Sequence, residues 1–369
     1  MPGDGPALSV VRARLVVFQR DRSGTYHPAS ASEGVVAMSS KVKVRVSTIG
    51  EIAAMVPLLA GYEVTGSVVV LALGMPGADP RQVGFVARLD LPSAVDAPKV
   101  AAALMDGVTR HGAARAVGIA YPSLGQDPAP VLDALAALGI DVHDLAVCEP
   151  GRVRGHGCSD PECLTWVPLP EPPAGVAMRP VAASREAFAE ALAASTSADA
   201  VSEAADGVPE PRAREVFGAW AQIADVDGPD VDTLNPAVIA HAVAGAAGDV
   251  QVRDFLAAWL SPGTLPADAF DPVTAAVGTA VLHTPSWGAG EPDGAVLVAR
   301  LMQVCPRVPQ RPQSAAALSV LASAFWYQGE GTAARVLLAR ALAAVPHYRL
   351  ALLLTQMMDL GITPAREGR

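Results

Sequence analysis

Prolines accumulate in one short stretch of the chain and divide it into two parts. They are Pro161, Pro168, Pro170, Pro172, Pro173 and Pro180. Proline has no main-chain N–H and a fixed φ, so it continues neither a helix nor a central strand. The chain has 369 residues and is 51% hydrophobic, enough for two cores. We therefore predict a domain boundary here, with a proline-rich linker over residues 166–180.

The part before this linker alternates between strand and helix patterns. Residues 41–46 alternate apolar and charged side chains, and Thr48 and Glu51 have capping-box spacing for a helix that Pro57 is expected to kink or end. Strands are predicted at 67–73, 83–90, 115–121 and 144–148, with helices from Asp96 to Gly112 and near 130–138, and one more short strand after 149–152. The alternation predicts an α/β domain over residues 41–165, with a mixed sheet, a hairpin and right-handed β-α-β crossovers.

The part after the linker carries helical signals only. We predict an all-helical domain over residues 181–362. With Pro346 as the closing proline of a tetratricopeptide-like hairpin, the small and large positions fall on Leu318, Leu321, Ala322, Phe325, Gly329, Ala334, Leu338 and Ala341. One period earlier, Arg300 and Arg307 occupy positions that require aromatic or small residues, so a single hairpin is predicted, with a helix over 347–360 packed on it.

Both ends of the chain have tail-like patterns. Residues 1–40 are expected to be a disordered tail, and residues 363–369 a second short tail. Met38 precedes the first patterned segment and is a candidate start of translation.

Charge and composition argue against three classes of protein: nucleic-acid-binding, membrane-spanning and disulfide-rich secreted proteins. The net charge is −10 and the pI about 5.2, which argues against nucleic-acid binding. Apolar runs are too short for a membrane span, and arginines interrupt the run at 15–18, so neither a membrane segment nor a signal peptide is expected. Four cysteines in a chain of this length do not make a disulfide framework, which favours a cytoplasmic protein.

Common catalytic motifs are missing from the sequence. It contains no Gly-x-Ser-x-Gly elbow and no His-Glu-x-x-His, and no Gly-x-Gly-x-x-Gly follows a predicted strand. The glycines at 61 and 66 lack the lysine of a phosphate-binding loop. The sequence therefore leaves open whether the protein is an enzyme.

One polar pair lies at the end of a predicted strand. Arg88 and Asp90 are two residues apart and share a face at the carboxyl end of the strand, where open α/β sheets bind ligands. Tyr121 ends the next predicted strand and is a third candidate for ligand binding. The alternative is a structural ion pair that fixes the turn at Pro92.

A second cluster follows the last predicted strand. Cys148, His156, Cys158 and Cys163 are side chains that zinc accepts, and His156, Cys158 and Cys163 are the candidate metal ligands. The Cys-x4-Cys spacing is at the wide end for a zinc knuckle, and Cys148 sits in an apolar strand. Packed or redox-reactive thiols, with no cofactor, are the alternative interpretation.

Several of these segments together resemble the actinobacterial family catalogued as domain of unknown function 4192. The similar segments are 56–61, 67–69, 88–92, 158–163, 324–329, 340–342 and 346–350. Where the family has paired cysteines, this chain has Cys163 followed by Leu164, Thr165 and Trp166, which weakens a metal site needing a third thiolate. The resemblance implies a domain layout from about residue 41 onward and no particular activity.

Two hypotheses for function follow, from different classes. The first is an interaction or regulatory module in which the terminal hairpin, through Phe325, Trp326 and Tyr348, binds a protein partner. The second is a small-molecule-binding protein or enzyme with its site at the sheet edge around Arg88 and Asp90. The sequence leaves the oligomeric state open.

Overall fold

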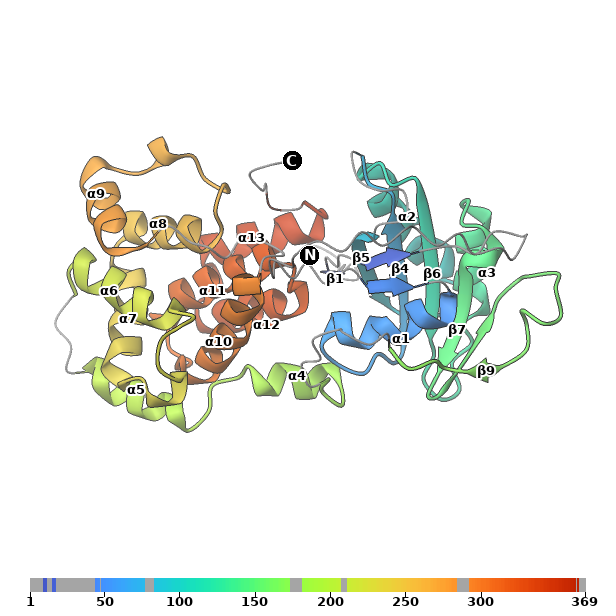
Figure 1. Ribbon diagram of the computed structural model, residues 1–369, viewed down its shortest axis with the longest axis horizontal. Helices are drawn as coiled ribbons and strands as arrows, with labels where there is room; N and C mark the ends of the chain where they lie inside the picture. Colours follow the sequence, from blue (N-terminus) through green and yellow to red (C-terminus); the bar gives the residue numbers. More distant parts are fainter. Residues whose placement is uncertain are drawn as a thin grey trace, which may run out of the picture. The chain divides into compact units, whose positions relative to one another are not determined.

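The computed structural model divides the chain into two compact units, Met1–Arg185 and Glu186–Arg369 (Figure 1). We call the first the sheet unit and the second the helical unit. The structure describes residues 9–11, 15–17, 44–46, 48–76, 83–172, 181–206, 211–283, 292–362 and 364. The fold class is mixed α/β.

The sheet unit is built on one mixed sheet. Its strands, in spatial order, are β1 (Ser9–Val11), β5 (Val83–Asp90), β4 (Ser67–Leu73), β6 (Arg115–Tyr121), β7 (Leu145–Glu149), β8 (Arg152–Gly155) and β9 (Val167–Pro168). Strands β2 (Leu15–Val17) and β3 (Val44–Val46) pair in a second, two-stranded sheet. The predicted hairpin of β4 and β5 and the predicted mixed sheet are confirmed.

Strand direction brings three carboxyl ends to one edge of this sheet. Strand β4 is antiparallel to both β5 and β6, and β6 is parallel to β7. Strands β5, β6 and β7 therefore run the same way and end at Asp90, Tyr121 and Glu149. We call this the carboxyl edge of the sheet.

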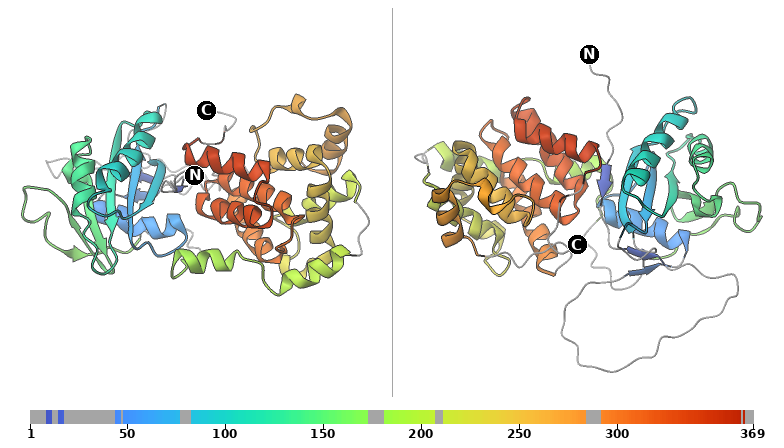
Figure 2. Two further views of the ribbon diagram at one scale, coloured as in Figure 1. Left: turned by 180° about the vertical axis from the view of Figure 1, so that it is seen from behind. Right: turned by 90° about the horizontal axis from the view of Figure 1, so that it is seen from above.

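Helices cover both faces of the sheet. On one face, α2 (Ala97–Arg110) and α3 (Ala129–Ala137) pack on alternate residues of the strands, among them Val70, Phe85 and Ala120. On the other face lies α1 (Ile49–Ala60), as both figures show (Figures 1 and 2). Strand β4 is buried along its whole length because both faces are covered.

Helix α1 has the predicted capping box but does not end at Pro57. Thr48 and Glu51 exchange the two capping hydrogen bonds. The helix continues to Ala60 and closes at Gly61, whose φ of 83° suits glycine. Proline cannot donate to the carbonyl four residues earlier, that of Ala53, and the Tyr121 hydroxyl donates to this carbonyl at 2.9 Å instead.

Some residues predicted as irregular form strands. Strands β1 and β2 lie within the range 1–40 predicted as a disordered tail, and β9 lies within the predicted linker. Met38, most of the linker after residue 172 and nearly all of the range 363–369 lie outside the described residues.

The helical unit has helices as its regular elements throughout its described residues, as predicted. They are α4 (Arg185–Ala191), α5 (Ser197–Asp206), α6 (Ala213–Ala224), α7 (Pro236–Gly248), α8 (Val250–Leu260), α9 (Pro272–Val281), α10 (Pro292–Val304), α11 (Ser314–Gln328), α12 (Gly331–Ala344) and α13 (Arg349–Asp359). In the described part of the chain, no helix is both long enough and apolar enough to cross a bilayer.

The last three helices pack on one another. Helices α11 and α12 are joined at Gly329, whose φ is 93°, and α13 packs against both. Helix α11 is buried on nearly all sides and lies at the centre of the unit. The predicted hairpin with a third helix is therefore present, and its tetratricopeptide character stays a prediction.

Buried arginines hold the helical unit together through main-chain carbonyls. Arg300 donates to the carbonyls of Gln222, Ile223 and Pro229; Arg307 to those of Val231 and Leu234; and Arg340 to those of Leu192, Cys305 and Val308. Gln222 and Ile223 belong to the last turn of α6, whose carbonyls have no partner within the helix. This explains why arginines occupy two positions at which a second tetratricopeptide repeat would need small or aromatic residues.

Candidate functional sites

The Arg88–Asp90 pair lies at the carboxyl edge of the sheet. The Arg88 guanidinium donates from Nε to Ser67 Oγ at 2.9 Å and from a terminal nitrogen to Asp90 Oδ1 at 3.0 Å. It also lies over the ring of Tyr62, 5.8 Å from its centroid. The side chain of Arg88 is 12% exposed and that of Asp90 is 74% exposed. The ion pair considered from the sequence is present, and the group that reaches solvent is the carboxylate.

Tyr121 ends β6 at the same edge, but its side chain contacts helix α1. Ser67 pairs with Asp90 on one side and with Tyr121 on the other, so the ends of β5 and β6 flank it. The Tyr121 side chain is buried, and its hydroxyl donates to the Ala53 carbonyl. Burial raises the pKa of Tyr121 well above its usual value, and nearby Cys148 adds to this. The phenol is thus engaged by α1 and is not available to a ligand at the carboxyl edge.

The cysteine loop after β8 is arranged differently from the predicted metal site. His156 Nε2 is 2.8 Å from Asp133 Oδ1, a residue of α3. Cys158 Sγ instead lies 3.5 Å from Nδ1 of His143, in the short 3-10 helix Val142–Asp144. Among the described residues, no three His, Cys, Asp or Glu side chains are placed to hold a metal ion. His143, which was missed from the sequence, takes the place beside Cys158 that was assigned to His156.

The cysteines of this unit differ in their surroundings. Burial, followed by a hydrogen bond with Cys158 and the charge of that residue, raises the pKa of Cys163 to about 11. Cys148 is buried in β7, and burial raises its pKa to about 12. Cys148 therefore behaves as a packed thiol, whereas Cys158 and Cys163 interact with each other.

Two of the three predicted partner-binding residues have structural roles. Phe325 is 0% exposed because α11 lies at the centre of the unit, so its proposed contact with a partner is corrected to a place in the core. Trp326 is half-buried. Tyr348 is half-buried and precedes the first residue of α13.

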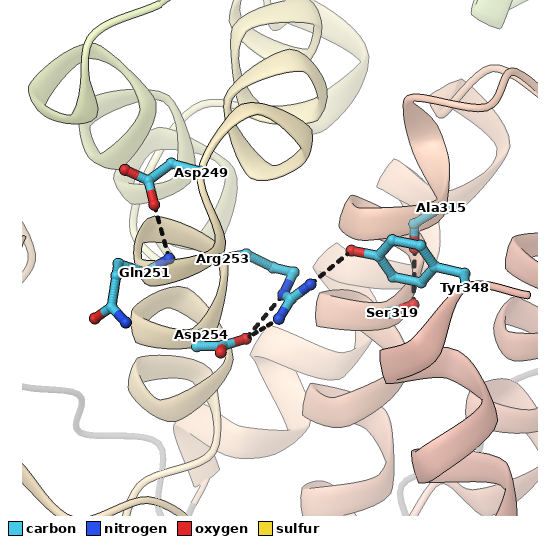
Figure 3. A network of polar contacts seen from close by, with 7 residues as sticks. All are labelled: Asp249, Gln251, Arg253, Asp254, Ala315, Ser319 and Tyr348. Carbon is cyan, nitrogen blue, oxygen red and sulfur yellow. Dashed lines mark hydrogen bonds and ion pairs between the residues drawn. The ribbon is translucent and has the colours of Figure 1, made fainter. Parts of the chain in front are cut away.

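Tyr348 takes part in a polar network between α8 and α13 (Figure 3). Arg253 donates to the Tyr348 hydroxyl at 3.1 Å and to Asp254 Oδ1 from two nitrogens. Burial by itself would lower the pKa of Arg253, but its hydrogen bonds with Tyr348 and Asp254 outweigh this and raise it. The network therefore fixes the start of α13 against α8 with a charged arginine.

The exposed apolar residues of the helical unit include one cluster that was not predicted. It comprises Leu352, Leu353, Leu360 and Ile362, which are 45%, 51%, 47% and 43% exposed. Leu353 on α13 and Leu360, the residue that follows the helix, lie seven residues apart, with half-buried Met357 between them on the same side. The opposite side of α13 is packed against its neighbours. We call these four residues the α13 face.

The comparisons with known proteins identify a family for the chain. The family model described as a domain of unknown function (DUF4192) matches residues 50–365, which include parts of both units. No curated protein matches the chain, and no solved structure matches it. Because the matched range covers most of the sequence, the chain belongs to the DUF4192 family.

Proposed function

We propose that the protein is an interaction module whose helical unit binds an amphipathic helix of a partner protein along the α13 face. One observation carries the proposal: four large aliphatic side chains are each roughly half exposed on the last helix and the turn that follows it. Contiguous exposed apolar side chains on a soluble protein commonly mark a binding surface. Leu353, Met357 and Leu360 have the spacing with which helices present anchors to one another.

The α13 face supplies part of the free energy that specific binding requires, and polar contacts around it would supply the rest. Full burial of a leucine side chain contributes about 1.5–3 kcal/mol, so covering the exposed half contributes about 1 kcal/mol for each residue. The four residues of the α13 face would contribute about 4 kcal/mol before the cost of association. An exposed arginine, Arg349, lies at one end of α13 and Asp359 at the other, which gives the face a polar rim.

A crosslinking experiment identifies the partner and a titration tests the site. A photoreactive amino acid is placed at position 353 of the full chain in the source organism, and the crosslinked protein is identified by mass spectrometry. The purified partner is then titrated with the wild-type chain and with Leu353→Asp. A carboxylate that is buried without a counter-charge opposes binding, so the affinity should fall tenfold or more.

Val296 supplies the matched control. It is 47% exposed, close to the value of Leu353, but lies on α10. A photoreactive group at position 296 should not capture the same partner, and Val296→Asp should leave the affinity unchanged. Equal weakening by both substitutions, or binding that neither one weakens, would contradict the assignment to the α13 face.

We propose, as a second candidate function, that the sheet unit binds a small cationic molecule at Asp90. The supporting observation is that Arg88 holds Asp90 through Oδ1 at the edge where the carboxyl ends of β5, β6 and β7 meet, while the Asp90 side chain is 74% exposed to solvent. Putrescine and spermidine are suitable probes, tested by the shift in melting temperature. The shift should vanish in Asp90→Asn and persist in Asp106→Asn, which removes an exposed carboxylate paired with Arg110 on α2. No shift in the wild-type chain would rule out these ligands.

A further inference from the structure

Two cysteines are held at the base of one short turn in the sheet unit. The main-chain N–H of Asp160 donates to Cys158 Sγ at 3.4 Å, and the N–H of Cys163 donates to the Asp160 carbonyl at 3.1 Å. The carbonyl of Cys163 accepts from the N–H of Gly155 at 2.7 Å. A side chain at Gly155 would collide with Cys163 Sγ. The absence of a side chain at 155 thus lets the second cysteine lie close against the strand that leads to the first.

The two thiols differ in access to solvent. Cys158 is 5% exposed, whereas Cys163 is half-buried, and the four residues between them are exposed. A reagent in solution therefore reaches Cys163 before it reaches Cys158. Asp160 is hydrogen-bonded both to Cys158 Sγ and to the main-chain N–H of Cys163, so both cysteines belong to one turn, and, after burial, a hydrogen bond between their thiols contributes to the raised pKa of Cys163.

Cys158 has a base beside it that the other buried cysteines do not share. His143 Nδ1 lies 3.5 Å from Cys158 Sγ, within reach of a proton transfer. The thiol of Cys148 is directed at the carbonyl of Glu149, and that of Cys305 at the carbonyl of Leu301. Cys158 and Cys163 together therefore combine a neighbouring base with access to solvent, whereas Cys148 and Cys305 are buried against main-chain carbonyls.

We propose that Cys158 and Cys163 form a reversible disulfide by exchange with a low-molecular-weight disulfide, with Cys163 as the accessible thiol, Cys158 as the resolving thiol and His143 as its base. This assigns a redox modification site to the sheet unit, independent of the protein-binding role proposed for the helical unit. A disulfide here would covalently close the loop that connects β8 to β9.

The exchange proceeds in two balanced steps. Cys163 attacks one sulfur of the small disulfide as its thiolate, a form that becomes more abundant as the pH rises toward the Cys163 pKa of about 11. This forms a mixed disulfide on Cys163 and releases one small thiol, which carries the proton that Cys163 lost. Cys158 then attacks the sulfur of Cys163 while His143 accepts its proton. The second small thiol leaves and takes that proton from His143, so two protein thiols are oxidised and one small disulfide is reduced to two thiols.

Mass mapping of the wild-type chain tests the proposal without any variant. The reduced full chain is incubated with glutathione disulfide at about pH 9, where part of Cys163 is the thiolate. The sample is then quenched with acid, alkylated, digested and analysed by mass spectrometry. The expected product is a peptide pair joined between Cys158 and Cys163, with Cys148 and Cys305 still reduced. Recovery of Cys158 and Cys163 as free thiols, or of glutathione retained on Cys163, would overturn the proposal.

Variants separate the two steps. Cys158→Ser should accumulate glutathione on Cys163, because the resolving thiol is missing. His143→Asn should slow the conversion of the mixed disulfide to the internal one by about tenfold or more, since the base is lost. His156→Asn is the matched control, because its imidazole pairs with Asp133 instead. Equal rates in the two histidine variants would refute the role of His143.

Discussion

The hydrogen bond from Tyr121 to Ala53 predicts an energetic coupling between two residues that are distant in sequence. In α1, the carbonyl of Ala53 lacks its usual donor because residue 57 is proline, and the Tyr121 hydroxyl supplies one at 2.9 Å. Tyr121→Phe keeps the aromatic ring in the core and removes only this donor. Residue 53 is fully buried, so water does not replace the lost hydrogen bond.

The cost follows from the burial of the carbonyl. A buried acceptor left without a partner costs about 1–3 kcal/mol, and we take about 2 kcal/mol for a site as enclosed as Ala53. This corresponds to a shift of about thirtyfold in the opening equilibrium of α1. In a Pro57→Ala background, the N–H of residue 57 can donate to the Ala53 carbonyl, so the penalty of Tyr121→Phe should fall below about 0.5 kcal/mol.

Hydrogen exchange of the α1 amides measures this coupling between positions 57 and 121. Peptides that span residues 49–60 report the local opening free energy of α1 in the wild-type chain, both single variants and the double variant. A coupling of about 1.5 kcal/mol between positions 57 and 121 is expected. If Tyr121→Phe is neutral, or costs the same with proline and with alanine at 57, the hydroxyl does not stand in for the missing main-chain donor.

Three further predictions concern the helical unit. Arg340→Leu should destabilise it by about 3 kcal/mol or more in urea unfolding, because three buried carbonyls lose their donor; a loss below about 1 kcal/mol would contradict this. Phe325→Ala should cost about 3–5 kcal/mol of stability, whereas Leu353→Ala should leave the urea midpoint nearly unchanged, since only the first side chain is in the core. Hydrogen bonds from Thr274 lower the pKa of Asp271, the N-cap of α9. The stabilising contribution of this carboxylate is therefore present above about pH 4 and is lost as the pH falls through the lowered pKa. The difference in melting temperature between wild type and Asp271→Ala should shrink in acid, and a constant difference would refute this prediction.

Local features of the fold were predictable from the sequence because their causes are local. The capping box of Thr48 and Glu51 lies within four residues, and the strands over 67–73 and 115–121 were predicted with the bounds that the structure has. The effect of Pro57 was not predictable, because its compensation comes from Tyr121, a residue on a strand that packs against the helix from elsewhere in the chain.

The candidate sites depended more heavily on tertiary structure. Arg88 and Asp90 were found because strand periodicity places them on one face. The partner of Cys158 was misassigned because His143 precedes β7 and comes near the loop only through the pairing of β7 with β8. Both sides of α13 carry apolar residues, and periodicity alone does not tell which side is packed: Leu354 is buried and Leu353 is exposed.

The order of strands in the sheet bears on how the protein is assembled during synthesis. After β4 and β5 pair as a hairpin, β6 adds to β4, β7 adds to β6, β8 adds to β7 and β9 adds to β8. The strand with which each of these strands pairs precedes it in the chain and has a free edge when the new strand is made. None of them must be inserted between two strands that are already paired. These strands can thus pair one after another as the chain leaves the ribosome. Each strand edge then stays unpaired only briefly, which reduces the opportunity for aggregation.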